Sequence, residues 1–233
     1  MKRSGSQNVP ALIVLCAVLS LILVSCALGA TQLNEEGGQL LSYGHYADAL
    51  DKFNKALELD PTSSELWSNK GITLLQLKRN DEARQAFNKS IELNPKNVIA
   101  QKKMAQTLLQ LQLYDDALRM YDRLLESSPD DTDLMGWKVQ ALRGLGKDEE
   151  ILKIYDRMIE LKPNDPFRYY MKYATLDRLG RYEEALAAID ECLELNPNVC
   201  QNWLYKGDLL QKLGRTEEAD AATRKARSMP GCR

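Results

Sequence analysis

The chain has 233 residues and a formal net charge of −2, because 31 Lys and Arg residues nearly balance 33 Asp and Glu residues. These charges are interspersed and no run of five or more Lys or Arg occurs, which argues against nucleic acid as a partner. After the first 30 residues, Ala, Leu, Glu, Lys and Gln dominate and no alternating run of Val, Ile and Thr occurs, so the composition predicts helices rather than strands.

Residues 1–30 are predicted to be a signal peptide or a membrane anchor, and residues 31–233 the folded body. Lys2 and Arg3 precede residues 9–30, which are almost wholly apolar. Such a stretch is too apolar for the surface of a soluble helix. Because basic residues favour the cytoplasmic side of a membrane, we expect the body to be extracytoplasmic.

Within this apolar stretch, residues 23–26 (Leu-Val-Ser-Cys) resemble the lipobox of prokaryotic lipoproteins. The resemblance implies a prokaryotic protein whose Cys26 carries a lipid. We favour this lipid anchor over two alternatives. One is an uncleaved signal anchor, since about 20 apolar residues can span a bilayer. The other is cleavage after Gly29 or Ala30, which would release a secreted protein.

The body is organised by a repeat of 34 residues. Prolines recur at this interval without any insertion, at Pro61, Pro95, Pro129, Pro163 and Pro197. A constant period of this length is typical of helix-turn-helix repeats. We therefore expect six helix pairs, at about residues 30–63, 64–97, 98–131, 132–165, 166–199 and 200–233.

Each position of the repeat has a physical role. The eighth position holds mostly small residues: Gly37, Gly71, Ala105, Val139, Tyr173 and Gly207. The twentieth does so too: Ala49, Ala83, Ala117, Ile151, Ala185 and Ala219. Small side chains at both positions allow two antiparallel helices to approach closely. Acidic residues before the second helices, such as Asp81 with Glu82, favour a helix start, and each proline ends a second helix.

These positions, clearest in Trp67, Gly71, Ala83, Phe87 and Pro95 of the second repeat, resemble the tetratricopeptide repeat (TPR) family. The resemblance covers residues 30–233 without a break. It implies an all-α, right-handed superhelical solenoid of six antiparallel helix pairs, in which the first helices line a concave groove. Because each pair buries its apolar side against its neighbours, such a fold presents an extended surface for binding.

In this family, certain positions of the first helices face the groove. Here they are occupied by Lys102, Lys103, Gln106, Trp137, Gln140, Arg143, Phe167, Tyr170, Met171, Arg178 and Tyr205. Trp, Tyr, Met and Arg are enriched in protein interfaces, so we predict that a protein or peptide partner binds there. The alternatives are that the aromatic residues only fill space between irregular repeats and that the basic residues are solvated surface charges.

The sequence predicts no catalytic, cofactor or metal site. The single histidine, His45, falls in a predicted turn without a second ligand at a suitable spacing, and no set of nucleophile, base and orienting residue can be assembled. The five cysteines are Cys16, Cys26, Cys192, Cys200 and Cys232. A Cys192–Cys200 disulfide is one alternative, and buried or idle thiols are the favoured one.

These features favour a membrane-tethered, extracytoplasmic scaffold that binds protein partners and is not an enzyme. An alternative from another class is a protein that binds glycan or cell-wall fragments through the aromatic residues of the groove. That alternative requires polar groups beside the rings, for which Gln140 and Asp177 are the candidates. Self-association of the arrays through their terminal repeats is a third.

Overall fold

The computed structural model of the protein describes residues 27–232, which form helices joined by short turns. A first helix occupies residues 27–42. It is followed by α2 (Tyr46–Leu59), α3 (Ser64–Gln76), α4 (Asn80–Leu93), α5 (Val98–Gln110), α6 (Tyr114–Ser127), α7 (Thr132–Gly144), α8 (Asp148–Leu161), α9 (Pro166–Arg178), α10 (Tyr182–Leu195), α11 (Cys200–Lys212) and α12 (Thr216–Arg227). No strand occurs among these residues, and the twelve helices are the number that six pairs require. The predicted all-α fold of six helix pairs is confirmed.

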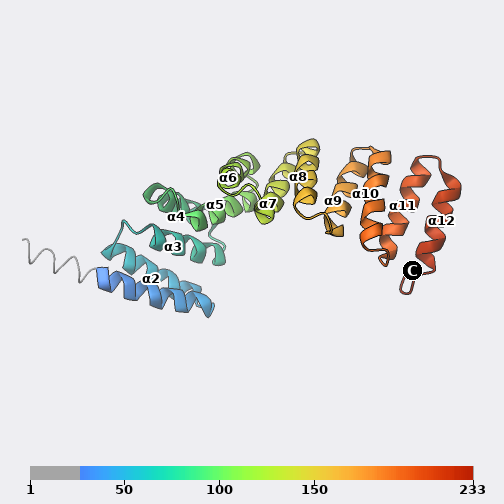
Figure 1. The fold of residues 1–233 in the computed structure, drawn as a ribbon. Coiled ribbons are helices and arrows are strands. Elements are labelled where there is room, and N and C mark those ends of the chain that lie inside the picture. Colours follow the sequence, from blue (N-terminus) through green and yellow to red (C-terminus); the bar gives the residue numbers. More distant parts are fainter. Residues whose placement is uncertain (1–26, 233) are drawn as a thin grey trace, which may run out of the picture. The chain divides into compact units, whose positions relative to one another are not determined.

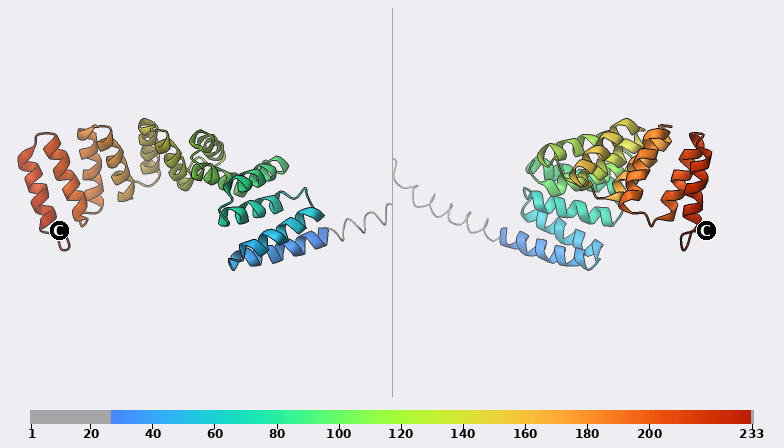
Figure 2. Two further views of the ribbon diagram at one scale, coloured as in Figure 1. Left: turned by 180° about the vertical axis from the view of Figure 1, so that it is seen from behind. Right: turned by 45° about the vertical axis from the view of Figure 1, so that its right-hand side comes forward.

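The chain divides into two compact units, Met1–Leu113 and Tyr114–Arg233, which we describe separately. Within each unit, every helix from α2 onward packs against the next one in the chain. Figures 1 and 2 show this succession, for example α9 to α12 standing side by side in the second unit. Order along the chain is therefore also order in space within each unit.

The two helices of each repeat are joined by the same turn. One residue in each turn has a positive φ: Gly44, Lys78, Gln112, Gly146, Gly180 and Gly214. After α3, the amide of Lys78 donates to the carbonyl of Leu75 and the amide of Arg79 to that of Leu74, both at 2.9 Å. This pair of bonds is a Schellman motif, which satisfies carbonyls left free at the end of a helix. Its recurrence explains why no repeat gains or loses a residue.

Side-chain caps begin four of the first helices. The residue before the helix accepts a backbone hydrogen bond through its side chain at Ser63, Asn97, Asp131 and Asp165. At the same position before α11 stands Val199, which forms no such bond. A polar cap contributes about 1 kcal/mol to the stability of a helix. α11 therefore begins without a contribution that α3, α5, α7 and α9 receive.

The close approach within a helix pair depends on the small residues of the eighth position. A Cβ added to Gly71 would lie 2.6 Å from Cε1 of Phe87, and one added to Gly37 would lie 2.8 Å from Cε1 of Phe53. Both phenylalanine rings are fully buried. The rings occupy the space where a side chain would otherwise stand, so the phenylalanine of the second helix fills the room left by the glycine of the first.

Salt bridges link successive repeats in the second unit at a constant register. The Lys Nζ of a first helix lies 2.6–2.8 Å from an Asp carboxylate of the preceding second helix, in the pairs Lys138–Asp122, Lys172–Asp156 and Lys206–Asp190. These side chains are partly exposed, so each pair contributes at most about 1 kcal/mol. The three pairs therefore make a modest contribution to how one repeat sits on the next.

The cysteines differ from the prediction. A disulfide joins Cys200 to Cys232, and Cys192 is a free, buried thiol. The favoured idle thiols are therefore wrong for Cys200 and Cys232, and a Cys192–Cys200 bond is wrong as well. The reason is that antiparallel packing places the chain beyond the end of α12 beside the start of α11, where the two Cα atoms are 5.9 Å apart.

No helix among residues 27–232 is long and apolar enough to cross a membrane. The lipobox with Cys26, and most of the predicted anchor of residues 1–30, lie outside the described residues.

Candidate partner-binding site

Two pockets of the second unit extend from one first helix to the next. The α7–α9 pocket has a volume of about 540 Å³ and the α9–α11 pocket one of about 370 Å³. Phe167, on α9, lines both pockets and is 64% exposed. We call the two pockets together with Phe167 the α7–α11 groove.

The α7–α9 pocket brings together five predicted groove residues. These are Trp137, Gln140, Arg143, Phe167 and Met171. Its opening follows from the sequence of α7, since the neighbouring Gly136 has no side chain and a Cβ added there would meet nothing within 4 Å. A wide and mainly apolar surface beside exposed aromatic rings is typical of a site where another chain binds.

Positive charge exceeds negative charge at one end of this pocket. Asp148 accepts two hydrogen bonds from Arg178, at 2.9 and 2.5 Å, and these hold the pKa of its carboxyl below the usual range. Arg143 also lowers this pKa, but among the described residues it forms no salt bridge and donates only to the hydroxyl of Tyr155, at 3.4 Å. Burial raises the pKa of Tyr155, so this phenol stays neutral. At this end of the pocket, two guanidinium groups therefore lie near one carboxylate, whereas Asp133 lines the pocket from the first turn of α7.

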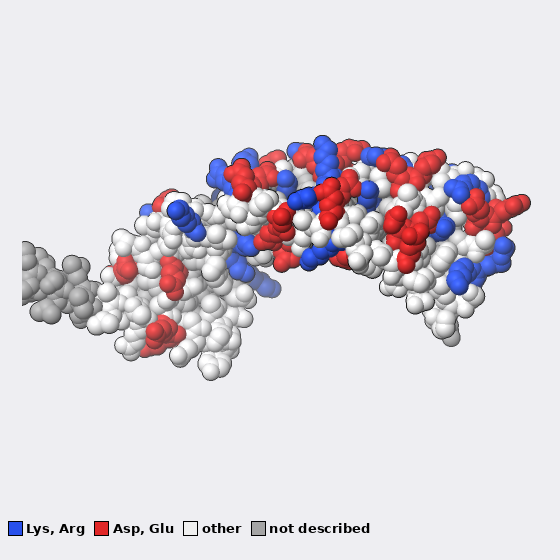
Figure 3. All heavy atoms as spheres, viewed as in Figure 1, with Lys and Arg blue, Asp and Glu red and all other residues white. Residues whose placement is uncertain are grey.

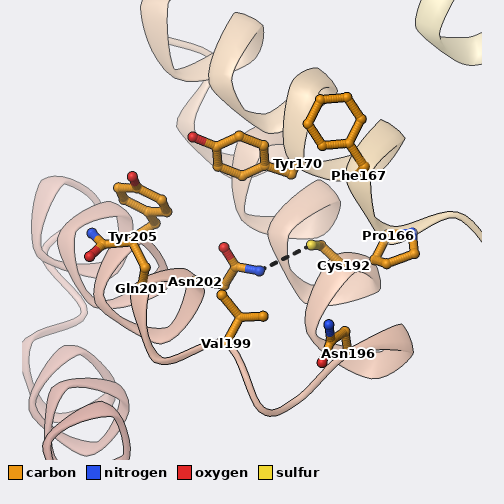
Figure 4. Close-up of a pocket in the computed structure, with 9 residues that line it drawn as sticks. All are labelled: Pro166, Phe167, Tyr170, Cys192, Asn196, Val199, Gln201, Asn202 and Tyr205. Carbon is orange, nitrogen blue, oxygen red and sulfur yellow. Dashed lines mark hydrogen bonds between the residues drawn. The ribbon is translucent and has the colours of Figure 1, made fainter. Parts of the chain in front are cut away.

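The α9–α11 pocket is walled by aromatic rings (Figure 4). Tyr170 lies 5.9 Å from Tyr205 and also 5.9 Å from Tyr173, measured between ring centroids, and Phe167 lies 6.4 Å from Tyr170. The hydrogen bond with Tyr205 raises the pKa of Tyr170, so the phenol of Tyr170 is protonated at neutral pH. The pocket is therefore uncharged and aromatic on this side.

The other side of the α9–α11 pocket is held by a buried polar contact. The amide nitrogen of Asn202 donates to Sγ of Cys192 at 3.3 Å, drawn as a dashed line in Figure 4. Val199 and Gln201, which flank Cys200 of the disulfide, line this side as well. The disulfide thus anchors the segment that forms this wall.

Four of the predicted site residues lie elsewhere. Arg178 lines neither pocket and is paired with Asp148. Lys102, Lys103 and Gln106 are half-buried on α5, in the first unit, and line neither pocket of the groove. The structure thus gathers Trp137, Gln140, Arg143, Phe167, Met171, Tyr170 and Tyr205 in one groove.

Some lining residues were missed from the sequence. Tyr155 and Met158 belong to a second helix, α8, yet reach the α7–α9 pocket. They were missed because only first-helix positions were considered. Gln201 stands at a first-helix position of the kind that the TPR resemblance marks as groove-facing, so that signal was sufficient to find it. Asn202 and Val199 had no such signal.

Among the described residues, neither the charged side chains nor the potential metal ligands indicate a second binding site. Acidic and basic side chains are interspersed over the visible face of the second unit, whereas that of the first unit is mostly uncharged (Figure 3). Among residues 27–232, no group of three or more His, Cys, Asp or Glu side chains could hold a metal ion. His45 is exposed in the turn before α2.

Family models match successive parts of the chain. The tetratricopeptide repeat model matches residues 40–107 and 74–134. The model for subunit 3 of the anaphase-promoting complex, or cyclosome, matches residues 110–192, and the repeat of the protein prenyltransferase alpha subunit matches residues 182–213. No curated protein sequence matches the chain.

Solved structures of similar fold include several TPR proteins. The C-terminal part of a TPR protein from Cytophaga hutchinsonii has a TM-score of 0.70 at 16% identity, over 82% of this chain and 77% of that one. A MamA RS-1 double mutant has a TM-score of 0.65 at 19% identity, over 72% of this chain and 95% of that one. YrrB, described as a TPR protein with an unusual peptide-binding site, has a TM-score of 0.59 at 21% identity, over 75% of this chain and 90% of that one.

Similarity at these identities concerns the fold, and the family models agree with it. The helix pairs of 34 residues, their close approach at small residues and the matching family models lead to one conclusion. The chain belongs to the tetratricopeptide repeat proteins.

Proposed function

We propose that the chain is a scaffold, held at the extracytoplasmic face of a prokaryotic membrane, that binds protein partners through the α7–α11 groove and has no catalytic role. The observation that carries this proposal is the pair of pockets separated by Phe167, a ring that is 64% exposed. An apolar ring left in water between two concave surfaces favours a partner that covers it.

The relatives support binding of a peptide or an extended segment. YrrB is described by its peptide-binding site, and the first TPR domain of Spaghetti was solved with an HSP90 peptide bound. The latter has a TM-score of 0.50 at 24% identity, over 52% of this chain and 95% of that one. The family also favours binding over catalysis, since TPR folds are typically interaction scaffolds.

Position-specific photo-cross-linking tests the binding site. A photoreactive benzoylphenylalanine replaces Phe167 in the full chain, in cells, and the control carries the same residue in place of Lys153, which is exposed on α8 and lines neither pocket. We expect light to attach a protein at position 167 and not at position 153. Equal products at both positions, or a product only at position 153, would refute binding through the groove.

Two features support the proposed location. Lys2 and Arg3 before the apolar residues 9–30 favour export of the body. The disulfide between Cys200 and Cys232 favours an oxidising compartment, because disulfides persist in exported proteins and are rare in the cytosol.

Intact mass spectrometry of the membrane-extracted protein tests the anchor. We expect a chain that begins at Cys26 and carries the mass of its lipids. A chain that begins at Met1 would refute the lipid anchor and would support an uncleaved signal anchor in its place. A chain that begins at Thr31 would refute the membrane attachment.

A further inference from the structure

We propose that the partner of the α7–α11 groove is an extended segment with two aliphatic side chains three residues apart and a carboxylate directly before or directly after this pair. This inference rests on the proposed function and specifies the chemistry of the ligand at the same site. It depends on the positive charge at the Arg143 end of the α7–α9 pocket and on the position of the two pockets on either side of α9.

The charge argument concerns Arg143. Its guanidinium lines the α7–α9 pocket, whereas the nearby carboxylate of Asp148 is already bound by both Arg178 nitrogens. These three groups sum to one positive charge at the end of α7, whereas Asp133, the carboxylate that lines the same pocket, lies in the first turn of that helix. The hydroxyl of Tyr155 accepts only one of the hydrogen bonds that Arg143 can donate. A carboxylate is the group that a planar guanidinium with free donors binds best.

The spacing argument concerns α9. Because the pockets lie on opposite sides of this helix, their centres are about one helix diameter apart, roughly 10 Å. In a polyproline II conformation, three residues advance the chain by about 9 Å and return a side chain to the same face. Two aliphatic side chains three residues apart would therefore enter both pockets while the backbone crosses Phe167.

The order of the groups follows from the lining of the groove. Arg143 belongs to α7, on the side of the α7–α9 pocket away from Phe167 and the second pocket. The carboxylate must therefore precede or follow both aliphatic residues rather than stand between them. No part of the geometry selects one chain direction, so the test includes both.

Two fluorescent peptides with blocked ends provide the probes, one containing Asp-Leu-Ser-Ser-Leu and one containing Leu-Ser-Ser-Leu-Asp. Their binding to the full chain in detergent is measured by fluorescence anisotropy at low salt. Matched peptides replace Asp by Asn, replace both Leu by Ser, or place the two Leu side by side. We expect one direction to bind, with a loss of about three- to fivefold for Asn, as for a partly exposed ion pair.

Protein variants assign the charge effect. R143Q is expected to lose affinity for the Asp peptide by the same factor and to bind the Asp and Asn peptides equally. The control R123Q removes an exposed arginine of α6 that lines neither pocket, and it should behave as the wild type. The preference for Asp should fall as salt is raised, because salt screens partly exposed charges.

The outcomes separate this inference from the proposed function. Equal binding of the Asp and Asn peptides to the wild type, or equal binding of the peptide with adjacent Leu residues, refutes the inference. So does the failure of every peptide to bind while position 167 still cross-links a protein partner. In these cases the proposed function stands. It is refuted only if the cross-linking experiment yields no product specific to position 167.

Discussion

Replacing Gly71 with Ala tests the steric basis of the helix pairs. The added methyl group would lie 2.6–2.8 Å from three ring carbons of Phe87, a side chain with 0% exposure. Carbon atoms in contact prefer about 3.5–4.0 Å, so the ring must retreat by about 1 Å into a filled core. Such overpacking costs about 1–3 kcal/mol, whereas Ala gains about 1 kcal/mol over Gly in a helix. The net effect is a loss of about 1 kcal/mol.

Gly38→Ala is the matched control. Gly38 lies inside the first helix, and a Cβ added there meets nothing within 4 Å. This variant should therefore gain about 0.5–1 kcal/mol from helix propensity alone. Urea unfolding of the full chain, followed by the helical signal in circular dichroism, measures both variants against the wild type. If Gly71→Ala is stabilised as much as Gly38→Ala, the close approach at Phe87 does not limit the helix pair.

Three further predictions concern turns, the disulfide and the salt bridges. Lys78→Gly should raise the free energy of unfolding by about 0.5–1 kcal/mol in urea, because Lys78 has a positive φ that glycine adopts without strain. Cys232→Ser should lower the free energy of unfolding by about 2–4 kcal/mol, because the variant lacks the disulfide to Cys200. For the same reason, a dithiol reductant should destabilise the wild type but not this variant. A double-mutant cycle with Lys172→Ala and Asp156→Ala should give a coupling energy of about 0.2–1 kcal/mol, and a value near zero would contradict their role in repeat register.

The fold was predictable because its signals are repeated. A proline every 34 residues and small residues at two positions gave the helix pairs, as Gly71 and Ala83 illustrate. The turns were harder to predict from the sequence, because Lys78 and Gln112 adopt the positive φ that glycine adopts in the equivalent turns of the other repeats. There the Schellman hydrogen bonds and the packing of the pair override the local preference of the residue.

The disulfide was not predictable because the repeat does not encode it. Cys232 follows the last helix, and its distance from Cys200 depends on the path of the chain beyond Arg227. The missing cap at Val199 was visible in the sequence, as the position held by Ser63, Asn97, Asp131 and Asp165 in earlier repeats.

The groove was predictable in part. Trp137 and Phe167 were expected from the positions that face the groove in this family, and both line pockets. Arg178 satisfies the same rule of position, yet Asp148 binds it, because ion pairing depends on which side chains meet across two helices. Tyr155 reaches the pocket from a second helix, which a rule restricted to first helices does not include.

Hydroxyl-radical footprinting tests the central claim most directly, because it reads the solvent exposure of side chains. The wild-type full chain is oxidised alone and in a non-covalent complex with the partner that cross-linking at position 167 identifies. Phe167 is compared with Tyr43, which is 77% exposed and lies outside the groove. The account predicts that the partner protects Phe167 and Trp137 while the oxidation of Tyr43 is unchanged. Unchanged oxidation of Phe167 and Trp137 in the complex would contradict binding through the α7–α11 groove.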